Sequence, residues 1–276
     1  MTEQQPSTPT PPVAVLGGGV MGEALLSAVL AAGWSTHDVE VSEQSVDRAD
    51  ELAGRYAVRT GASNDGAAGR ADVVVIAVKP NVVGAVLEQI APVLRGGTVV
   101  VSVAAGVPIA FYEERLPAGT PVVRVMPNTP AVVGKGASAI APGSSATTGH
   151  LALVERLLSR TGLVVRVPEK DLDAVTAISG SGPAYAFYLI DAMAEAGVLL
   201  GLSRDLATKL AVATVEGAGA LAAQSGDHPA VLRERVSSPG GTTVAAVAEL
   251  DAHAVRAGVV AAARAAHRRS RELGQG

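Results

Sequence analysis

Residues 13–22 are Val13-Ala14-Val15-Leu16-Gly17-Gly18-Gly19-Val20-Met21-Gly22, an apolar tetrapeptide that leads directly into a G-x-G-x-x-G turn. Gly17 permits a tight turn, Gly19 lets a pyrophosphate approach the backbone, and Gly22 lets the next helix pack closely on the strand. That helix, expected over residues 23–30, would face the phosphates with free N–H groups and a partial positive charge. Glycine-rich loops also occur as ordinary turns, but the strand before this loop and the helix after it favour a dinucleotide-binding site.

Apolar strands alternate with helices over the first 167 residues. Strands are expected at residues 13–16, 39–42, 72–78, 98–103, 122–126, 137–141 and 163–167, and helices at 82–94, 109–116 and from about 148. After Asp72 the third strand is continuously apolar, which is typical of a parallel strand buried on both faces. This alternation predicts an α/β fold with an N-terminal, Rossmann-type, doubly wound parallel sheet.

The pattern changes at Pro168, beyond which strand signals give way to an Ala-rich, helical sequence. We therefore expect a dinucleotide-binding domain over residues 13–167 and an all-helical dimerisation and substrate domain over 168–276. Residues 1–12 carry four prolines and have neither the basic nor the apolar region of a signal peptide. They are expected to form a disordered leader.

Two expected helices, at residues 184–200 and 204–224, carry small and aliphatic side chains over much of their circumference. Pro183 opens the first helix and Ser203 caps the second. Helices that are apolar on more than one face need more than one partner surface. A helical segment of roughly 110 residues would hide these faces poorly by itself, so an intertwined homodimer is the economical expectation.

Composition narrows the functional classes. The 276 residues carry a net charge of −4, which gives no basic footprint for nucleic acid. The chain has no cysteine, which excludes thiol nucleophiles, disulfides and Cys-ligated metals, and its five histidines lack metal-site spacing. No apolar run reaches the ~18 residues of a membrane span without interruption. We therefore expect a soluble, cytoplasmic protein without metal, nucleic-acid or membrane partners.

Two motifs follow expected strands at their carboxyl ends, where open α/β sheets bind ligands. Lys79-Pro80 ends the strand at 72–78, because the proline stops the ladder and holds Lys79 extended. Ala104-Ala105-Gly106 follows the strand at 98–103, and these small residues would let a cofactor lie against the backbone.

The end of the strand at 39–42 bears on the choice between the two nicotinamide cofactors. An acid there favours NAD, whereas Ser or Arg accommodates the 2′-phosphate of NADP. Ser42, Ser45 and Arg48 suit a phosphate, whereas Glu43 would repel one. Glu43 and Arg48 also fit solvated charges at a helix start, so these residues leave the choice between NADPH and NADH open.

A glycine-rich loop in the helical half is a second candidate anion site. Ser237-Ser238-Pro239-Gly240-Gly241-Thr242-Thr243 precedes an expected helix whose free N–H groups would bind a small carboxylate. A well-capped helix start explains the same residues equally well. The helix break at residues 179–183 is Ser-Gly-Ser-Gly-Pro and not G-x-S-x-G, so a serine hydrolase is not indicated.

Taken together, these motifs resemble those of the pyrroline-5-carboxylate reductase family. The matching stretches are residues 17–22, Ala77-Val78-Lys79-Pro80, Val103-Ala104-Ala105-Gly106, Met126-Pro127-Asn128-Thr129-Pro130, residues 173–185 from Asp173 to Tyr185, and residues 237–243. The resemblance implies a Rossmann domain, a helical dimerisation domain, and reduction of 1-pyrroline-5-carboxylate to L-proline, the last step of proline biosynthesis. It also implies NADPH as the cofactor, with NADH as the alternative, and a pentamer of dimers.

The resemblance also assigns roles to individual residues. It implies that the cofactor is held by Gly17, Gly18, Gly19, Val20, Met21, Gly22, Ser42, Asn64, Ala77, Val78, Lys79, Pro80, Ala104, Ala105, Gly106, Pro127 and Asn128. Ser42 and Asn64 would lie at the adenosine ribose or its phosphate; without the family, Asn64 would pass as a turn residue. The substrate would be held by Ser238, Gly240, Gly241, Thr242 and Thr243, with Thr243 as the catalytic residue beside the ring nitrogen. Glu43 stands where many relatives carry a small or uncharged residue.

Two alternatives remain, a different reductase and a protein of another functional class. Reductases of the β-hydroxyacid dehydrogenase kind also join a Rossmann half to a helical half, and they carry a lysine and an asparagine one turn apart on the interdomain helix. This chain has Lys170 but Ala174 one turn later, which disfavours that reading. A catalytically silent, NAD(P)-binding regulatory module is the other alternative, and it would bind nucleotide without turnover.

Overall fold

The computed structural model describes residues 10–274, which form two compact units. The Rossmann unit runs to Gly180 and takes up the chain again from His267, and the helical unit comprises Ser181–Ala266. The expected domain boundary lies earlier, at Pro168. Residues 1–9 of the expected leader lie outside the described part, but Pro11 and Pro12 are already fixed, because their carbonyl groups accept hydrogen bonds from Trp34 Nε1 and from the Val73 N–H, both at 3.0 Å.

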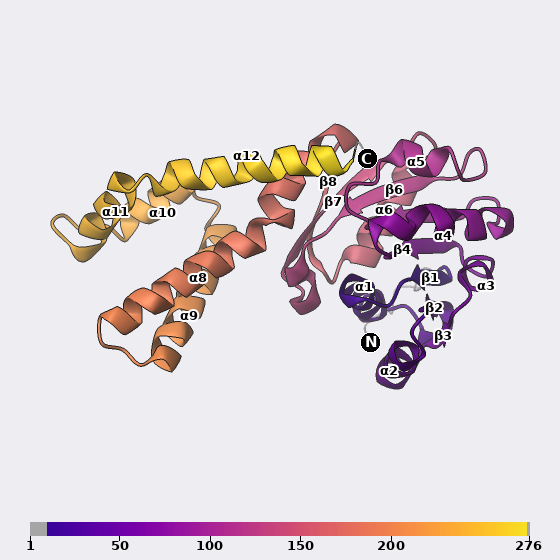
Figure 1. Cartoon of the computed structure of the whole chain (residues 1–276), viewed down its shortest axis with the longest axis horizontal. Coiled ribbons are helices and arrows are strands. Elements are labelled where there is room, and N and C mark those ends of the chain that lie inside the picture. The colour runs from indigo at the N-terminus through magenta and orange to yellow at the C-terminus, as the bar shows by residue number, and fades with distance from the viewer. Residues whose placement is uncertain (1–9, 275–276) are drawn as a thin grey trace, which may run out of the picture. The chain divides into compact units, whose positions relative to one another are not determined.

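The Rossmann unit is built on one eight-stranded sheet in the order β3-β2-β1-β4-β5-β6-β7-β8 (Figure 1). The strands are β1 (Val13–Leu16), β2 (Val39–Ser42), β3 (Arg59–Gly61), β4 (Val73–Ile76), β5 (Val99–Ser102), β6 (Val122–Met126), β7 (Gly136–Pro142) and β8 (Gly162–Arg166). Strands β1 to β6 are parallel, β7 is antiparallel to β6, and β8 is parallel to β7. The predicted Rossmann-type sheet is therefore confirmed, with β7 and β8 reversed. Its strand order reverses between β1 and β4, where such sheets bind ligands.

Helices cover both faces of the sheet, and their apolar sides form two cores. One face carries α1 (Val20–Ala31), α2 (Val46–Tyr56) and α6 (Thr148–Leu158); the other carries α3 (Asn64–Ala68), α4 (Val83–Ile90), α5 (Ile109–Glu113) and α7 (Leu172–Val175). Nearly all buried core side chains are aliphatic, because β-branched Val suits buried parallel strands and Leu and Ala fill the inner faces of the helices.

Short helices of other types complete the Rossmann unit. The 3₁₀ helices are η1 (Thr36–Asp38), η2 (Pro80–Val82), η3 (Ala91–Val93), η4 (Thr129–Val133) and η5 (Glu169–Asp171). The helix expected at 82–94 is thus α4 with a 3₁₀ turn at each end. A π-helix at Thr176–Gly180, which the sequence did not predict, ends the first part of the unit.

The helical unit contains α8 (Gly182–Leu199), α9 (Arg204–Ser225), α10 (Pro229–Arg235), α11 (Thr242–Ala252) and most of α12 (Val255–Leu273). Pro183 stands in the first turn of α8, and the Ser203 hydroxyl accepts the Leu206 N–H at the start of α9, as predicted. The fully buried core of this unit consists of Ala194, Ala207 and Ala211. Many of its large apolar side chains are exposed, so this unit by itself hides few of them.

Helix α9 has the length and hydropathy of a membrane span, with 22 residues and only 11% of its most apolar window buried. These two properties alone do not indicate a membrane span, because core helices of soluble proteins share them. The exposed leucines Leu206, Leu210 and Leu221 equally suit contact with another protein surface.

Candidate functional site

The glycine loop lies at the carboxyl end of β1, beside the end of β4. Leu16 pairs with Ile76 in the sheet, and the Ala77 N–H donates to the Leu16 carbonyl at 2.8 Å. Gly17 has φ +103°, and a Cβ there would lie 2.9 Å from the Ala77 carbonyl oxygen. The loop therefore needs glycine at its first position for both conformational and steric reasons.

The remaining glycines of the loop divide into packed and open positions. A Cβ on Gly22 would lie 1.9 Å from the Gly17 carbonyl oxygen, and one on Gly18 would lie 2.6 Å from Leu52. A Cβ on Gly19 would meet nothing within 4 Å, and Gly19 precedes α1 without a side-chain cap. Gly19 thus borders open space, and no side chain caps the first N–H groups of α1, which leaves room for a pyrophosphate there. Among its neighbours, Val20 is 70% exposed and Met21 packs against the core.

Glu43, directly after β2, binds the glycine loop. Its carboxylate accepts the Gly18 N–H at 2.8 Å and the Ser45 N–H at 2.9 Å. Ser42, by contrast, is 2% exposed, and its hydroxyl has no partner among the described residues, whereas its carbonyl accepts the Gly17 N–H at 2.8 Å. The residue at the end of β2 that presents a polar side chain to the loop is therefore Glu43, which follows the strand.

Arg48 is held in a charge network and is not a free cation. Its Nε donates to the Gly18 carbonyl at 2.8 Å, and its other nitrogens pair with Glu23 and Glu51 at 2.5 and 2.7 Å. Burial raises the pKa of Glu23, but hydrogen bonds from Arg48 and Tyr56 outweigh it and bring that pKa below its usual value. Arg55 also pairs with Glu23 and Glu51, so the network holds two carboxylates and two guanidinium groups. Arg48 is therefore engaged by protein partners, and Glu43 lies beside the same loop, so these residues leave the choice between NADPH and NADH open.

Asn64 is buried and bonds to another side chain of the protein. It is 8% exposed, and its side-chain nitrogen donates to Gln89 Oε1 at 2.8 Å. The preceding Ser63 caps α3 by accepting the Gly66 N–H, so Asn64 begins a helix where a turn was the interpretation without the family. Asn64 thus joins α3 to α4 in the structure.

The ends of β4 and β5 lie at the same edge of the sheet as the glycine loop. After β4, Lys79 is exposed and extended, with φ −63° and ψ 147°, and Pro80 opens η2. Val78 packs against the second core. After β5, Ala104 is buried, Ala105 is exposed, and Gly106 has φ +77°. Lys79, Pro80 and Ala105 are the exposed members of these two motifs and are therefore open to a ligand.

A buried hydroxyl pair fixes the loop after β5. Ser102 and Tyr112 are both fully buried, and their hydroxyl oxygens are 2.5 Å apart. The Ala104 N–H also donates to the Ser102 hydroxyl at 3.2 Å. Burial raises the pKa of Tyr112 to about 12, partly offset by the Ser102 hydrogen bond. Nothing in the sequence spacing identified this pair.

Tyr112 makes the free energy of unfolding depend on pH in the alkaline range. In the unfolded chain a tyrosine has a pKa near 10, whereas burial raises the pKa of Tyr112 in the folded protein to about 12. The contribution of Tyr112 to the free energy of unfolding is therefore fully present below pH 10 and is lost as the pH rises toward 12. Between these values the free energy of unfolding should fall by about 1.4 kcal/mol per pH unit. In Tyr112→Phe this contribution should be absent. Urea unfolding of both proteins across that range measures it, and parallel pH profiles would contradict it.

Pro127 and Asn128 follow β6 and are both buried. Asn128 uses both ends of its amide within the protein: the nitrogen donates to the Ser179 carbonyl at 2.9 Å, and the oxygen accepts the Ala137 N–H at 2.8 Å. Asn128 therefore lies at the carboxyl edge of the sheet as expected, but it is engaged by the protein's own backbone.

The Ser-Pro-Gly-Gly-Thr-Thr loop leads into α11 in the helical unit. The Gly241 N–H donates to the Ser238 carbonyl at 2.9 Å, and Gly240 has φ +69°, which closes a turn. Gly241 is the N-cap of α11 and gives no side-chain cap. Thr242 is exposed and Thr243 half-buried in the first turn, beside N–H groups that are open to an anion. Thr243 is not the capping residue.

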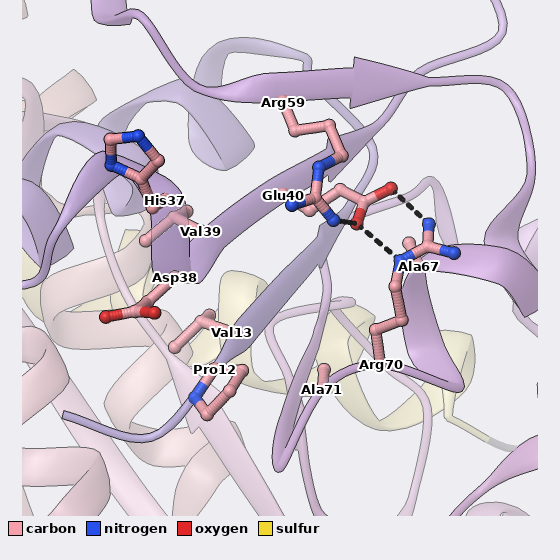
Figure 2. A pocket seen from close by; sticks show the side chains of 10 residues that line it. All are labelled: Pro12, Val13, His37, Asp38, Val39, Glu40, Arg59, Ala67, Arg70 and Ala71. Carbon is pink, nitrogen blue, oxygen red and sulfur yellow. Dashed lines mark hydrogen bonds and ion pairs between the residues drawn. The ribbon is translucent and has the colours of Figure 1, made fainter. Parts of the chain in front are cut away.

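A cavity of about 180 Å³ lies at the opposite, amino-terminal edge of the sheet, beside the first residues of β1 and β2 (Figure 2). Glu40 pairs there with Arg59 at 3.1 Å and with Arg70 at 2.6 Å, as the dashed lines of Figure 2 show. None of the expected site residues lines this cavity. Because ligands of open α/β sheets bind at the carboxyl edge, the glycine loop is the better candidate site.

Comparisons with known proteins identify relatives of both halves. Residues 169–273 match the family model described as pyrroline-5-carboxylate reductase dimerisation, and residues 12–106 match NADP oxidoreductase coenzyme F420-dependent. A pyrroline-5-carboxylate reductase of Corynebacterium melassecola is 48% identical over 95% of this chain and 98% of its own, and one of Synechocystis is 42% identical over 95% and 97%.

Solved structures give the same result. A pyrroline-5-carboxylate reductase of Coxiella burnetii superposes with a TM-score of 0.91 at 34% identity, covering 96% of this chain and 99% of that one. A pyrroline carboxylate reductase of Plasmodium falciparum with NADP bound gives a TM-score of 0.85 at 30% identity, covering 96% and 98%. The expected family resemblance is thereby confirmed across both units.

Proposed function

We propose that this chain, which belongs to the pyrroline-5-carboxylate reductase family, reduces 1-pyrroline-5-carboxylate to L-proline with a hydride from NAD(P)H. The observation that carries the proposal is the 48% identity to a named reductase over 95% of the chain. The open Gly19 position and the uncapped start of α1 support nucleotide binding by this chain's own residues.

The test is oxidation of NADPH, and separately of NADH, by the purified protein with and without 1-pyrroline-5-carboxylate. We expect oxidation that depends on the imine. A protein that binds the nucleotide but does not oxidise it with this imine would instead be a regulatory module. Turnover of a 3-hydroxy acid with the oxidised nucleotide in its place would favour the β-hydroxyacid dehydrogenase alternative.

The chemistry asks little of the side chains. A protonated cyclic imine is already electrophilic, so the protein's tasks are to orient it, to clamp its carboxylate and to support its ring nitrogen. The first N–H groups of α11, with Ser238, Gly240, Gly241 and Thr242, would hold the carboxylate, and the Thr243 hydroxyl would support the nitrogen. When bound, NAD(P)H supplies the hydride.

The proposed cofactor set centres on the glycine loop. Its open member is Gly19, and Lys79 and Ala105 extend it at the ends of β4 and β5. Gly17 and Gly22 shape the loop by close packing. The buried members Ser42, Asn64, Pro127 and Asn128 would support the site from within, because little of each is exposed.

Glu43 is the proposed determinant of nucleotide preference. If its carboxylate lies near the ribose 2′ position, Glu43→Gln should raise the ratio of kcat/KM for NADPH to that for NADH by about tenfold, roughly 1.4 kcal/mol, because a like charge is removed while the side chain still accepts the Gly18 N–H. Steady-state kinetics with both nucleotides measures this ratio. Glu51→Gln serves as the control, because it removes a carboxylate that pairs with Arg48 and Arg55 and does not bind the loop. An unchanged ratio in Glu43→Gln would place the charge away from the 2′ position.

The helical unit forms an oligomer through its dimerisation domain. We propose a homodimer, in which the exposed apolar residues of α8 and α9, such as Phe187 and Leu210, are covered by a second copy. A pentamer of dimers, assembled in the cytoplasm without membrane or nucleic-acid partners, extends this proposal. Light scattering at assay concentration tests it: a fully active monomer would contradict the dimer, and a dimer alone would contradict the pentamer.

A further inference from the structure

Asn128 joins three segments of the Rossmann unit. Its amide oxygen accepts the N–H of Ala137 in β7, and its amide nitrogen donates to the carbonyl of Ser179 in the π-helix. Only this orientation of the amide satisfies both partners, because Ala137 offers a donor and Ser179 an acceptor. Since Asn128 is 9% exposed, both hydrogen bonds are shielded from water and costly to lose.

The π-helix is the last segment before the chain enters the helical unit. That crossing falls between Gly180 and Ser181. A Cβ on Gly180 would lie 2.7 Å from the Met126 methyl group, so Gly180 packs closely on the end of β6. The Thr176 and Ser179 hydroxyls donate to the carbonyls of Leu172 and Val175, four residues back. We name residues 176–180 the exit segment; it is tied to β6 by packing and to the β6–η4 loop through Asn128.

The second crossing is tied down in a comparable way. The chain returns to the Rossmann unit between Ala266 and His267. There the Ser270 hydroxyl, 7% exposed, donates to Asp173 Oδ1 at 2.6 Å. Both points at which the chain changes unit are thus anchored to the Rossmann unit by a side chain with little exposed surface.

We propose that Asn128 is a positioning residue: it fixes the exit segment, and so the point from which the helical unit starts, and it contacts neither nucleotide nor substrate. This inference rests on the proposed function, because residues 238–243 of the proposed substrate loop belong to the helical unit. Release of the exit segment then impairs use of the imine and leaves nucleotide binding intact.

Asn128→Asp tests the proposal. The aspartate keeps an acceptor for the Ala137 N–H, but when ionised it offers no donor to the Ser179 carbonyl. We expect kcat/KM for the imine to fall ten- to a hundredfold while the dissociation constant for NADPH stays within about twofold of wild type. Protonation restores the missing donor, so the deficit relative to wild type should shrink at acidic pH. A purely structural defect would not recover in this way.

Ser179→Ala is the matched control. Asn128 binds the backbone carbonyl of Ser179, so this variant removes a neighbouring hydroxyl and leaves the bond to Asn128 in place. It should have wild-type kcat/KM. A weaker affinity for NADPH in Asn128→Asp, matching the loss in kcat/KM, would make Asn128 a nucleotide ligand and overturn the proposal. Wild-type kinetics in Asn128→Asp would overturn it as well.

Hydrogen–deuterium exchange keeps the inference separate from the proposed function, because it needs no turnover. In Asn128→Asp, exchange should quicken in residues 176–184 and remain as in wild type in residues 13–30. Suppose that the wild-type protein fails to reduce the imine, but that exchange differs in this way between wild type and Asn128→Asp. The proposed function is then wrong and the anchoring role of Asn128 stands. Unchanged exchange in residues 176–184 would refute the anchoring role whatever the protein reduces.

Discussion

Gly19→Val is expected to raise the dissociation constant for NADPH by about 100-fold, roughly 2.7 kcal/mol, while the protein folds normally. Gly19 has φ −66° and ψ −174°, an extended conformation that valine adopts readily. A Cβ there meets no protein atom within 4 Å, so the added side chain has room in the unliganded protein. It would fill the space at the start of α1 that a pyrophosphate needs.

Two other glycine variants show whether this loss is specific. Gly22→Ala places its Cβ 1.9 Å from the Gly17 carbonyl oxygen, so it should lower the melting temperature. Gly54→Val lies on the exposed side of α2, where a Cβ meets nothing within 4 Å, and should leave nucleotide affinity unchanged. Fluorescence titration with NADPH and thermal melting on the same preparations measure both properties. Wild-type affinity in folded Gly19→Val would remove this loop from the nucleotide site.

Much of the Rossmann unit could be predicted because its signals are local. The apolar runs of β1, β4 and β5 are buried on both faces. The spacing of the glycines at 17, 19 and 22 indicates directly where the backbone has no room for a side chain and where a ligand needs the space. Strand β3 was missed because Arg59–Gly61 is three residues long and not apolar. The reversed direction of β7 was missed because an apolar run indicates a strand without indicating which way it points.

The site was less predictable, because its contacts join residues far apart in sequence. Arg48 suited a phosphate by type, but in the structure it binds Glu23 and the Gly18 carbonyl. Asn128 was expected at the cofactor edge, and its partner Ser179 lies 51 residues away. Side-chain type indicates what a residue is able to bind, whereas the fold determines which partner lies within hydrogen-bonding distance of it.

Thr243→Ala is expected to lower kcat/KM for the imine by ten- to 150-fold, or ~1.5–3 kcal/mol. The reason is the loss of a hydroxyl that supports a ring nitrogen whose charge changes during hydride transfer. A capping role would predict a different outcome, with about 1 kcal/mol lost from folding stability and the kinetics nearly unchanged. The structure disfavours capping, because Gly241 is the N-cap of α11 and no hydrogen bond joins the Thr243 hydroxyl to another residue among those described. Stability should therefore change little.

Thr243→Ser supplies the matched comparison, because it keeps the hydroxyl and loses only the methyl group. It should retain most of the wild-type kcat/KM, whereas Thr208→Ala, which removes an exposed hydroxyl from α9, should behave as wild type. Melting curves and kcat/KM are to be measured on the same preparations of all four proteins. If Thr243→Ala melts lower but keeps near-wild-type kinetics, its hydroxyl stabilises the helix start and takes no part in the reaction. If Thr243→Ser is as impaired as Thr243→Ala, the methyl group and not the hydroxyl is what the substrate requires.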